Sequence, residues 1–281
     1  MSSGALRANA ASRLRVYRPI PRTRATVCRW RASKVTRTRP RLAATFISVV
    51  VPTYNEVGSL RHLVPRLAAA LAGREWELIV VDDGSPDGTA DLAESYAPAH
   101  PVRVVRRPGK AGLASAVLAG FAQARGDVLL VMDADLSHPP EAVPRLASAI
   151  DAGADLAVGS RYVKGGGTED WPLRRRIVSR VACLLGNVLV PIRDSTSGFF
   201  AIRKSAIDGV KLNPIGFKIG FEVMARGRYG KAVEIPYVFR DRELGRSKFG
   251  RREIVQYMVQ LAQVGRDRLF GTKSDTSPTK R

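Results

Sequence analysis

Short apolar runs alternate with helical patterns from residue 46 onward, and this alternation restricts the fold more than any other feature of the chain. The first run, residues 46–52 (FISVVVP), is continuous and rich in β-branched residues, as expected for a parallel strand buried on both faces. Four more strands are predicted, at residues 77–81, 102–106, 127–132 and 156–158. Strands that alternate with helices predict a doubly wound, mostly parallel α/β sheet.

Helical periodicity fills the segments between these strands. After the first strand, Leu60, Leu63, Leu67 and Leu71 share one helical face, and Pro65 is expected to kink this helix or to mark its start. Further helices are predicted at residues 89–96, 111–124 and 141–150. The second half is less regular, with helical patterns near 173–189, 221–228 and 252–270 and a strand near 199–202. No internal repeat is present, so a single domain is the simplest architecture for 281 residues.

Positive charge is concentrated at the N-terminus. Residues 1–45 hold 12 of the 46 Lys and Arg residues and no Asp or Glu, so they supply more than half of the net charge of +21. Three interpretations stay open for this basic head: a solvated disordered segment, an organelle targeting peptide, or an arm that contacts anionic lipid or nucleic acid. We therefore expect a domain over residues 46–265, with residues 266–281 forming the end of a helix and a disordered tail.

Several protein classes are excluded by composition. With 45% hydrophobic and 25% charged residues, the chain is typical of globular proteins. Its two cysteines, Cys28 and Cys183, form no metal-binding or disulfide pattern and favour a reducing compartment. The longest uncharged apolar stretch, residues 181–192, is too short for a membrane span, and the head lacks the apolar core of a secretory signal. We expect neither an integral anchor nor export.

Polar clusters follow four of the predicted strands. They are PTYNE (52–56), DDGSPDGT (82–89), DAD (133–135) and GSRY (159–162). In isolation the Gly- and Asp-rich cluster also fits a tight turn. Ligands of open α/β sheets bind at the carboxyl ends of the strands, so four polar loops on one edge indicate a binding site.

Asp133 and Asp135 directly follow the apolar run at 127–132. Two carboxylates so close repel each other unless a cation lies between them. Mg²⁺ and Mn²⁺ accept carboxylate oxygens together with substrate phosphates. The pair therefore predicts a divalent metal site.

Other site chemistries lack their motifs. Neither GxGxxG after the first strand nor GxxxxGK[ST] is present, and the glycines at 165–167 read as a flexible loop. The three histidines, His62, His100 and His138, suggest no Ser–His–Asp arrangement, and only His138 lies near the aspartate pair.

Two basic segments have open interpretations. Residues 240–248 (RDRELGRSK) are either a solvated loop or a flexible clamp on phosphate. Residues 171–178 (WPLRRRIV) lead into the apolar stretch at 181–192. This segment is either a core helix with a charged first turn or a contact with anionic head groups at a membrane surface.

Taken together, these motifs resemble the family 2 glycosyltransferases of the GT-A fold, and within them the dolichol-phosphate (polyprenol-phosphate) mannose synthases. The matching blocks are VVVPTYNE (49–56), VVDDGSPDGT (80–89), GKAGLASAVLAGF (109–121), GDVLLVMDADLSHPPE (126–141), VGSRY (158–162), WPLRRRIVSR (171–180), DSTSGF (194–199) and RELGRSKFG (242–250). They keep a consistent order over residues 46–265. The resemblance implies a GT-A type, Rossmann-like domain.

The resemblance also implies a metal-dependent enzyme on the cytosolic face of a membrane that transfers mannose from GDP-mannose to a polyprenyl phosphate, with inversion. The implied metal ligands are Asp133, Asp135 and Ser137, although some relatives have Gln where this chain has Ser137. The implied donor-binding residues are Pro52, Tyr54, Glu56, Val81, Asp83, Asp133, Ala134, Asp135, Arg161, Lys218, Arg242 and Lys248. Asp135, Arg242 and Lys248 are the expected catalytic residues.

The implied reaction makes chemical sense for this set of residues. The metal, Mg²⁺ or Mn²⁺, neutralises the leaving diphosphate, and the anionic acceptor needs no strong general base. Unlike several relatives, the sequence has no C-terminal membrane spans, so it is expected to reach its lipid peripherally or through a small membrane subunit. The alternatives are a different donor such as UDP-glucose and, in another class, a nucleic-acid-binding protein, which would leave the acidic motifs unexplained.

Overall fold

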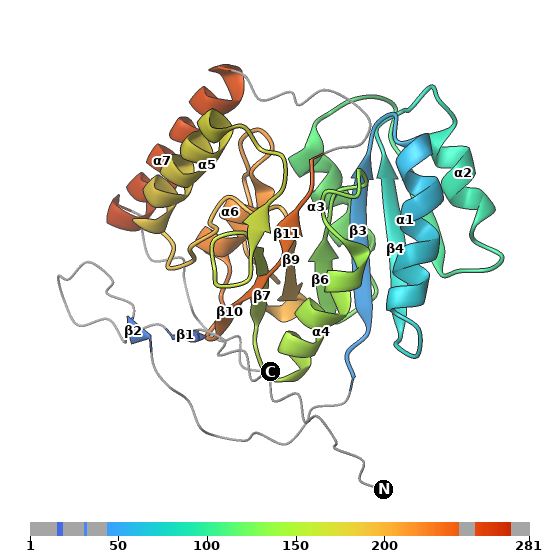
Figure 1. Ribbon diagram of the computed structural model, residues 1–281, viewed down its shortest axis with the longest axis horizontal. Helices are drawn as coiled ribbons and strands as arrows, with labels where there is room; N and C mark the ends of the chain where they lie inside the picture. Colours follow the sequence, from blue (N-terminus) through green and yellow to red (C-terminus); the bar gives the residue numbers. More distant parts are fainter. Residues whose placement is uncertain (1–15, 19–30, 33–43, 242–250, 271–281) are drawn as a thin grey trace, which may run out of the picture.

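A central β-sheet organises the protein. The computed structural model describes residues 16–18, 31–32, 44–241 and 251–270 (Figure 1). Among these residues the main sheet has the strand order β2-β1-β10-β7-β9-β6-β3-β4-β5. The strands are β1 (Val16–Arg18), β2 (Arg31–Ala32), β3 (Ile47–Thr53), β4 (Trp76–Asp82), β5 (Val102–Arg106), β6 (Val128–Val131), β7 (Leu156–Ser160), β9 (Phe200–Arg203) and β10 (Ala232–Pro236).

Six of the seven central strands, β10, β7, β6, β3, β4 and β5, point the same way. β3 pairs in parallel with both β4 and β6, β4 with β5, and β10 with β7. β9 lies antiparallel between β6 and β7. The predicted mostly parallel α/β sheet is therefore confirmed, and all six strands predicted from the sequence are present.

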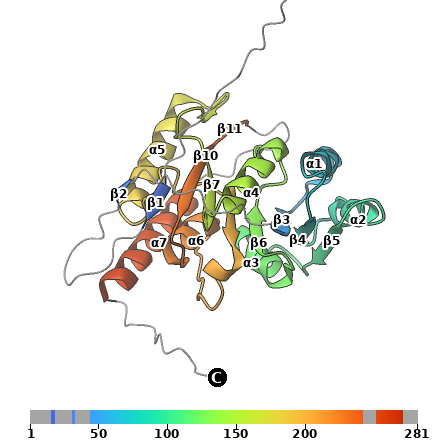
Figure 2. The same cartoon turned by 90° about the horizontal axis from the view of Figure 1, so that it is seen from below.

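Helices cover both faces of this sheet (Figure 2). One face carries α1 (Val57–Ala70), α2 (Thr89–Ser95) and α4 (Val143–Asp151), the last preceded by a 3-10 turn at Pro140–Ala142. The other face carries α3 (Leu113–Gln123) and α6 (Ile219–Arg226). The helices α5 (Leu173–Asn187) and α7 (Arg251–Phe270) lie side by side at one end of the molecule (Figure 1).

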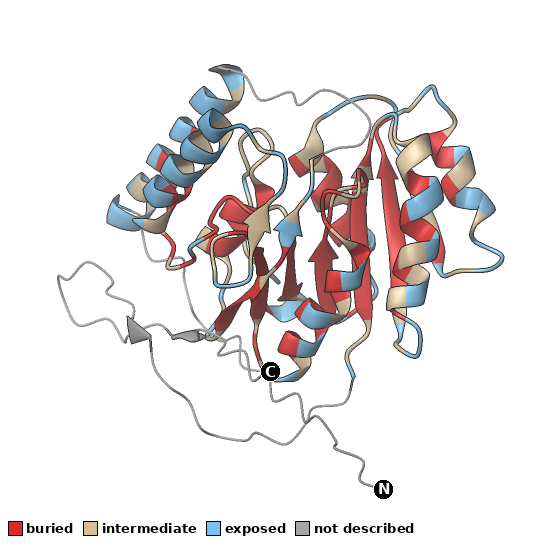
Figure 3. Ribbon diagram, viewed as in Figure 1, coloured by how far each residue is buried: buried red, intermediate tan, exposed pale blue. Residues whose placement is uncertain are grey.

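The two faces of the sheet form two separate hydrophobic clusters. Val49 and Val51 of β3 pack with α1 and α4, whereas Val50, between them, packs with Val81 and α3. All four side chains are fully buried, and the strands are the most buried part of the molecule (Figure 3). Burial on both faces explains why these strands have continuous apolar sequences rather than alternating ones.

Some features differ from the sequence-based expectation. Pro65 lies inside α1, which begins at Val57, so the proline does not mark the start of that helix. The strand β10 was missed because Glu234 interrupts its apolar run. A short ribbon between β8 (Gly167–Thr168) and β11 (Val238–Phe239) was also missed, since two-residue strands leave no periodic signal. Most of the basic head and the tail from 271 lie outside the described residues.

Gly120 of α3 allows this helix to pack directly on the sheet. A Cβ atom at this position would lie 2.4 Å from Val50 Cγ1 and 3.2 Å from Val81 Cγ2. Both valines are buried strand residues, so they cannot move aside without disturbing the sheet. We expect Gly120→Ala to lower the free energy of unfolding by about 1–3 kcal/mol, measured by urea denaturation, because the core becomes overpacked.

Gly265 of α7 provides the matched control. Its Cβ would meet only Leu189 Cδ2, at 4.0 Å, so Gly265→Ala should be neutral or stabilising by up to about 1 kcal/mol through helix propensity. Equal effects of the two substitutions would contradict the packing argument.

Candidate active site

The four polar clusters predicted from the sequence meet at one edge of the sheet. They follow β3, β4, β6 and β7, whose carboxyl ends point the same way because these strands are parallel to one another or connected through antiparallel β9. Since β9 runs the opposite way, the segment before it, residues 194–199, reaches this edge too. No role for that segment was expected from the sequence.

Two aspartates of the 82–89 loop hold its conformation. Asp82 accepts hydrogen bonds from Thr53 Oγ1 at 3.1 Å and from the backbone N–H of Ser85 at 2.8 Å. Asp87 accepts from the backbone N–H groups of Val57 and Thr89, at the starts of α1 and α2. These two carboxylates shape the loop rather than present a free charge.

Asp83 lies between this loop and the start of α3. Its Oδ2 accepts the backbone N–H groups of Ala111 and Gly112, at 3.1 and 3.2 Å, and its Oδ1 lies 3.0 Å from Arg107 Nη1. Asp83 is 5% exposed. Arg107, which the sequence analysis overlooked, thus pairs with a predicted donor-binding residue.

The other predicted residues of this half have different surroundings. Tyr54 is partly exposed and has the Lys110 ammonium 4.3 Å from its ring centroid. Glu56 accepts a hydrogen bond from Ser59 Oγ, and Pro52 is half-buried. The side chain of Val81 is fully buried against α3, so it faces the core.

The loop after β6 carries Asp133, Ala134 and Asp135. The Asp133 side chain is 29% exposed, whereas Asp135 is buried and accepts the backbone N–H of Ser137 at 3.0 Å. Leu136, between Asp135 and Ser137, has a positive φ of 62°, which turns the chain sharply after Asp135. This turn brings Ser137 back to the Asp135 carboxylate.

His138 fixes the backbone of the same loop. Its Nδ1 accepts the backbone N–H of Asp133 at 3.0 Å, and its ring stacks on Phe199 with centroids 4.9 Å apart. Burial lowers the pKa of His138, more than the nearby Asp133 and Asp135 raise it. The ring is therefore neutral, with its proton on Nε2. A histidine so engaged is a positioning group rather than a proton carrier.

The atoms of this loop suit a hard cation. The Ser137 hydroxyl is buried and has no hydrogen-bond partner among the residues that the structure describes, which is costly unless another group binds it. Within the described part of the chain, no group of three or more His, Cys, Asp and Glu residues is arranged for a metal. A cation held here would therefore combine Asp133 and Asp135 with hydroxyl or phosphate oxygens, the ligands that Mg²⁺ and Mn²⁺ prefer.

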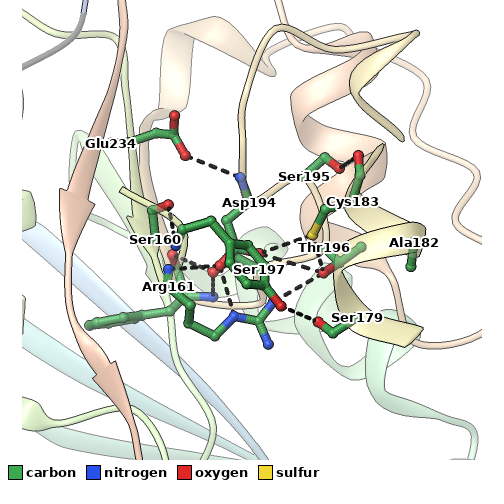
Figure 4. Close-up of polar contacts among 12 residues, drawn as sticks. Ser160, Arg161, Ser179, Ala182, Cys183, Asp194, Ser195, Thr196, Ser197 and Glu234 are labelled. Atoms are coloured by element: carbon green, nitrogen blue, oxygen red, sulfur yellow. Dashed lines mark hydrogen bonds and ion pairs between the residues drawn. The ribbon is translucent and has the colours of Figure 1, made fainter. Parts of the chain in front are cut away.

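Arg161, at the end of β7, forms a buried bidentate ion pair with Asp194 (Figure 4). Nε and Nη2 of Arg161 donate to the two carboxylate oxygens at 2.7 and 2.6 Å, and its backbone N–H donates to Oδ2 at 2.9 Å. Nη2 also donates to Thr196 Oγ1 at 3.0 Å. Burial alone would raise the pKa of Asp194, but Arg161 outweighs it and the pKa lies below its ordinary value.

Lys218 and Cys183 border this ion pair. The Lys218 ammonium lies 3.5 Å from the carbonyl oxygen of Thr196, and burial, followed by the charge of Arg161, lowers its pKa to about 8. The Cys183 sulfur lies 3.1 Å from Thr196 Oγ1, and burial raises the pKa of this thiol to about 11. Lys218 is thus a cation that can lose its proton in mildly alkaline solution.

Aromatic rings connect the site to the start of α5. The guanidinium of Arg175 lies 4.0 Å from the Trp171 ring centroid and that of Arg161 lies 5.3 Å from it. Trp171 packs edge-on against Phe239 at 5.1 Å, and Arg175 pairs with Asp241 at 2.6 Å. Asp241 is the last described residue before the 242–250 segment.

The structure brings together most of the predicted site residues. Arg242 and Lys248 lie outside the described residues, and their roles stay predictions. Sequence reasoning missed Arg107, Asp194 and Thr196. The signal for the last two was the DSTSGF block, which was matched as a motif without a role for its residues.

Comparison with known proteins identifies close relatives. A model of the family described as "Glycosyl transferase family 2" matches residues 48–223. The chain is 49% identical over 219 residues to a dolichol-phosphate mannosyltransferase of Pyrococcus furiosus, covering 76% of this chain and 62% of that protein's length. It is 43% identical to a polyprenol monophosphomannose synthase of Mycolicibacterium smegmatis, covering 77% of this chain and 86% of the relative.

Solved structures share the fold at lower identity. Glucosyl-3-phosphoglycerate synthase of Mycobacterium tuberculosis, solved with Mn²⁺ and UDP, has a TM-score of 0.60 at 21% identity and covers 85% of both chains. A mannosyltransferase of Pyrobaculum calidifontis, solved with GDP-Man and Mn²⁺, has a TM-score of 0.54 at 19% identity, covering 78% of this chain and 64% of that one. The shared architecture confirms the predicted fold.

Loss of the Arg161–Asp194 ion pair is expected to destabilise the protein. Asp194→Asn should lower the free energy of unfolding by about 3–5 kcal/mol at pH 7, since it leaves a buried guanidinium without a countercharge. The pKa of Asp194 in the folded protein is below its ordinary value. The ion pair therefore contributes its full stability at any pH above the ordinary pKa of an aspartate. This contribution is lost as the pH falls through the lowered pKa of the folded state. Urea denaturation should show the difference between wild type and variant constant from pH 5 to 8 and shrinking below pH 4.

Glu141→Gln is the control, because Glu141 pairs with Arg66 at an exposed position, with side chains 57% and 41% exposed. Its effect should stay within about 1 kcal/mol. A similarly small effect of Asp194→Asn would disprove the structural importance of the buried pair.

Proposed function

This chain belongs to glycosyl transferase family 2, and we propose that it transfers mannose from GDP-mannose to a polyprenyl phosphate, with inversion at the anomeric carbon. The proposal rests on one observation above all. Asp133 and Asp135 lie at the carboxyl end of β6, at the same sheet edge as Asp83 and Arg161. Relatives named dolichol-phosphate mannosyltransferase or polyprenol monophosphomannose synthase, 37–49% identical to this chain, support the donor sugar and the lipid class.

In this proposal Asp133, Asp135 and Ser137 hold Mg²⁺ or Mn²⁺. The bound cation would neutralise the charge that develops on the leaving diphosphate. The chain's own contribution is the geometry of its ligands: the His138 ring fixes the backbone of Asp133, and the Ser137 N–H fixes Asp135. The unpartnered Ser137 hydroxyl supports its inclusion.

The donor and acceptor contacts are proposed from the matched motifs. The nucleotide pocket would be lined by Pro52, Tyr54, Glu56, Val81, Asp83 and Ala134. Val81 would contribute through its backbone because its side chain is in the core. Positive charge for the phosphates would come from Arg161, Lys218, Arg242 and Lys248. Arg161 is already paired with Asp194, so we assign it to shaping this region and give Lys218, Arg242 and Lys248 the direct contacts.

The residues support catalysis by positioning and electrostatics. The acceptor is a phosphate, which is anionic at neutral pH and attacks without losing a proton to a strong base. His138 is neutral and already bonded to Asp133, so it takes no proton. Cations that hold two phosphates together would offset their mutual repulsion and place the acceptor oxygen in line with the anomeric carbon.

The exposed faces of α5 and α7 support peripheral contact with a membrane, which we propose to be its cytosolic face. No helix in the described ranges is long and apolar enough to cross a bilayer. Yet α5 exposes Ile177 and Leu184, and α7 exposes Val255 and Val259, each at least half exposed. Val188, directly after α5, is 78% exposed. Much of the ribbon of both helices is pale blue, that is exposed, in Figure 3. Such faces suit insertion at the head-group level, with or without a small membrane subunit.

Substitution of a proposed metal ligand and of a proposed phosphate-binding arginine tests the function. Asp135→Asn and Arg242→Ala should each reduce transfer of radiolabelled mannose from GDP-mannose to polyprenyl phosphate by about 100-fold or more. The product is chloroform-soluble and labile to mild acid, and EDTA should abolish its formation by the wild type. Unchanged thermal melting would show that the variants fold.

Full activity of either variant with metal present would overturn its assigned role. A product formed from UDP-glucose but not from GDP-mannose would overturn the proposed donor and leave the acceptor class in place.

Lys218 should give the reaction a dependence on pH. Its pKa of about 8 means that it carries its charge below pH 8 and loses it above, so phosphate binding should weaken as the pH rises through 8. Lys218→Arg, which stays protonated, should retain low KM values up to pH 9.5, whereas the exposed control Lys211→Arg should follow the wild type. Identical pH profiles for all three proteins would exclude this role for Lys218.

Membrane contact through α7 can be tested with vesicles. Val255→Glu combined with Val259→Glu places two charges on the exposed apolar face and should reduce cosedimentation with lipid vesicles by at least tenfold. The control combines Ala69→Glu and Ala72→Glu, two exposed positions at or beyond the end of α1. If both double variants lose binding equally, net charge rather than the apolar face would explain the result.

A further inference from the structure

A second basic pocket lies beside α5, apart from the proposed metal ligands. Its volume is about 410 Å³. It is enclosed by the loop that follows β7, by the second half of α5 and by Arg193. Its main lining residues are Arg161, Tyr162, Arg180, Leu184, Asn187 and Arg193, and none of Asp133, Asp135 and Ser137 is among them.

The pocket has unbalanced positive charge. Among the described residues that line it there is no Asp or Glu, and of its three arginines Arg161 is neutralised through Asp194. Arg180 and Arg193 are exposed, and neither forms an ion pair with any residue that the structure describes. The guanidinium of Arg180 lies 5.8 Å from the Tyr162 ring centroid. Two guanidinium groups are thus available to an anion.

The surroundings of the pocket are apolar. Leu184 forms part of its wall and is 68% exposed. Val181 of the same helix is 50% exposed, and Val188, directly after the helix, is 78% exposed. Exposed Leu and Val side chains beside arginines are typical of surfaces where acyl chains and charged head groups meet. A soluble anion would gain nothing from these side chains, whereas a lipid would gain from both.

We propose that Arg180 and Arg193 bind the phosphate group of an anionic bilayer phospholipid, as a site separate from the one that holds the reacting phosphates. The planar guanidinium group donates two parallel hydrogen bonds to phosphate oxygens. The proposal rests on the proposed membrane contact and adds the lipid class and the residues that select it.

The site would fix how the enzyme sits on the membrane. A head group bound between Arg180 and Arg193 would lie against the loop that carries Arg161 and Tyr162. Tyr162 in turn donates to Ser179 Oγ of α5 at 2.8 Å. The bound lipid would therefore hold the apolar face of α5 at head-group depth.

Vesicle binding with charge-conserving variants tests the site. The full-length chain is titrated with phosphatidylcholine vesicles with and without phosphatidylglycerol, in wild-type form and as Arg180→Lys with Arg193→Lys. The matched control is Arg174→Lys with Arg176→Lys, two exposed arginines of α5 that do not line the pocket. Lysine keeps the charge and loses the paired hydrogen bonds, so we expect at least a fivefold loss of affinity for phosphatidylglycerol vesicles in the pocket variant alone.

The remaining outcomes separate this proposal from the proposed function. Wild-type affinity of the pocket variant, or an equal loss in the control, would overturn the site and leave membrane contact in place. Failure of the wild type to bind either vesicle would overturn the membrane contact as well. Displacement of the protein from phosphatidylglycerol vesicles by millimolar inorganic phosphate, but not by equal ionic strength of chloride, would reassign the pocket to free phosphate.

Discussion

The buried ion pair between Arg161 and Asp194 is the interaction on which the site depends. Its members lie on segments 33 residues apart in the sequence. Asp194 in turn receives a backbone hydrogen bond from Ser197, and its own N–H donates to Glu234 of β10. A guanidinium and a carboxylate without water around them are tolerated only when each satisfies the other. The pair therefore fixes the relative positions of the end of β7, the segment before β9, and β10.

The antiparallel strand β9 makes this interaction possible. In a purely parallel sheet the segment preceding a strand lies at the edge opposite the carboxyl ends. Because β9 runs the other way between β6 and β7, Asp194, Thr196 and Phe199 reach the edge where Asp133 and Arg161 lie. Phe199 then supports His138, which holds the metal loop. One reversed strand thus supplies both the ion pair and the support of the proposed metal site.

The helices α5 and α7 each have one face packed against the protein and one exposed face. Their inner faces are tied down, since Tyr257 of α7 donates to the carbonyl of Ala182 and Gln260 donates to the buried Glu222 of α6. Their outer faces leave Leu184 and Val255 exposed, and Val188 is exposed directly after α5. The sequence left a core helix and a membrane contact as alternatives for residues 171–192. The burial pattern shows which side of the helix meets the protein, which a helical apolar repeat does not say, and membrane contact through the exposed side stays a proposal.

Local sequence determined six of the strands, the helices and the order of the polar loops, because a strand buried on both faces requires a continuous apolar run and a helix requires its own period. It did not reveal β10 or the two-residue strands β8 and β11. It also determined the pairing of Asp133 with Asp135, which are two residues apart. Tertiary structure decided the rest: the partnership of Arg161 with Asp194, that of Asp83 with Arg107, and the engagement of His138. These contacts join residues whose separation in the chain carries no periodic signal, so only the packing of the sheet brings them together.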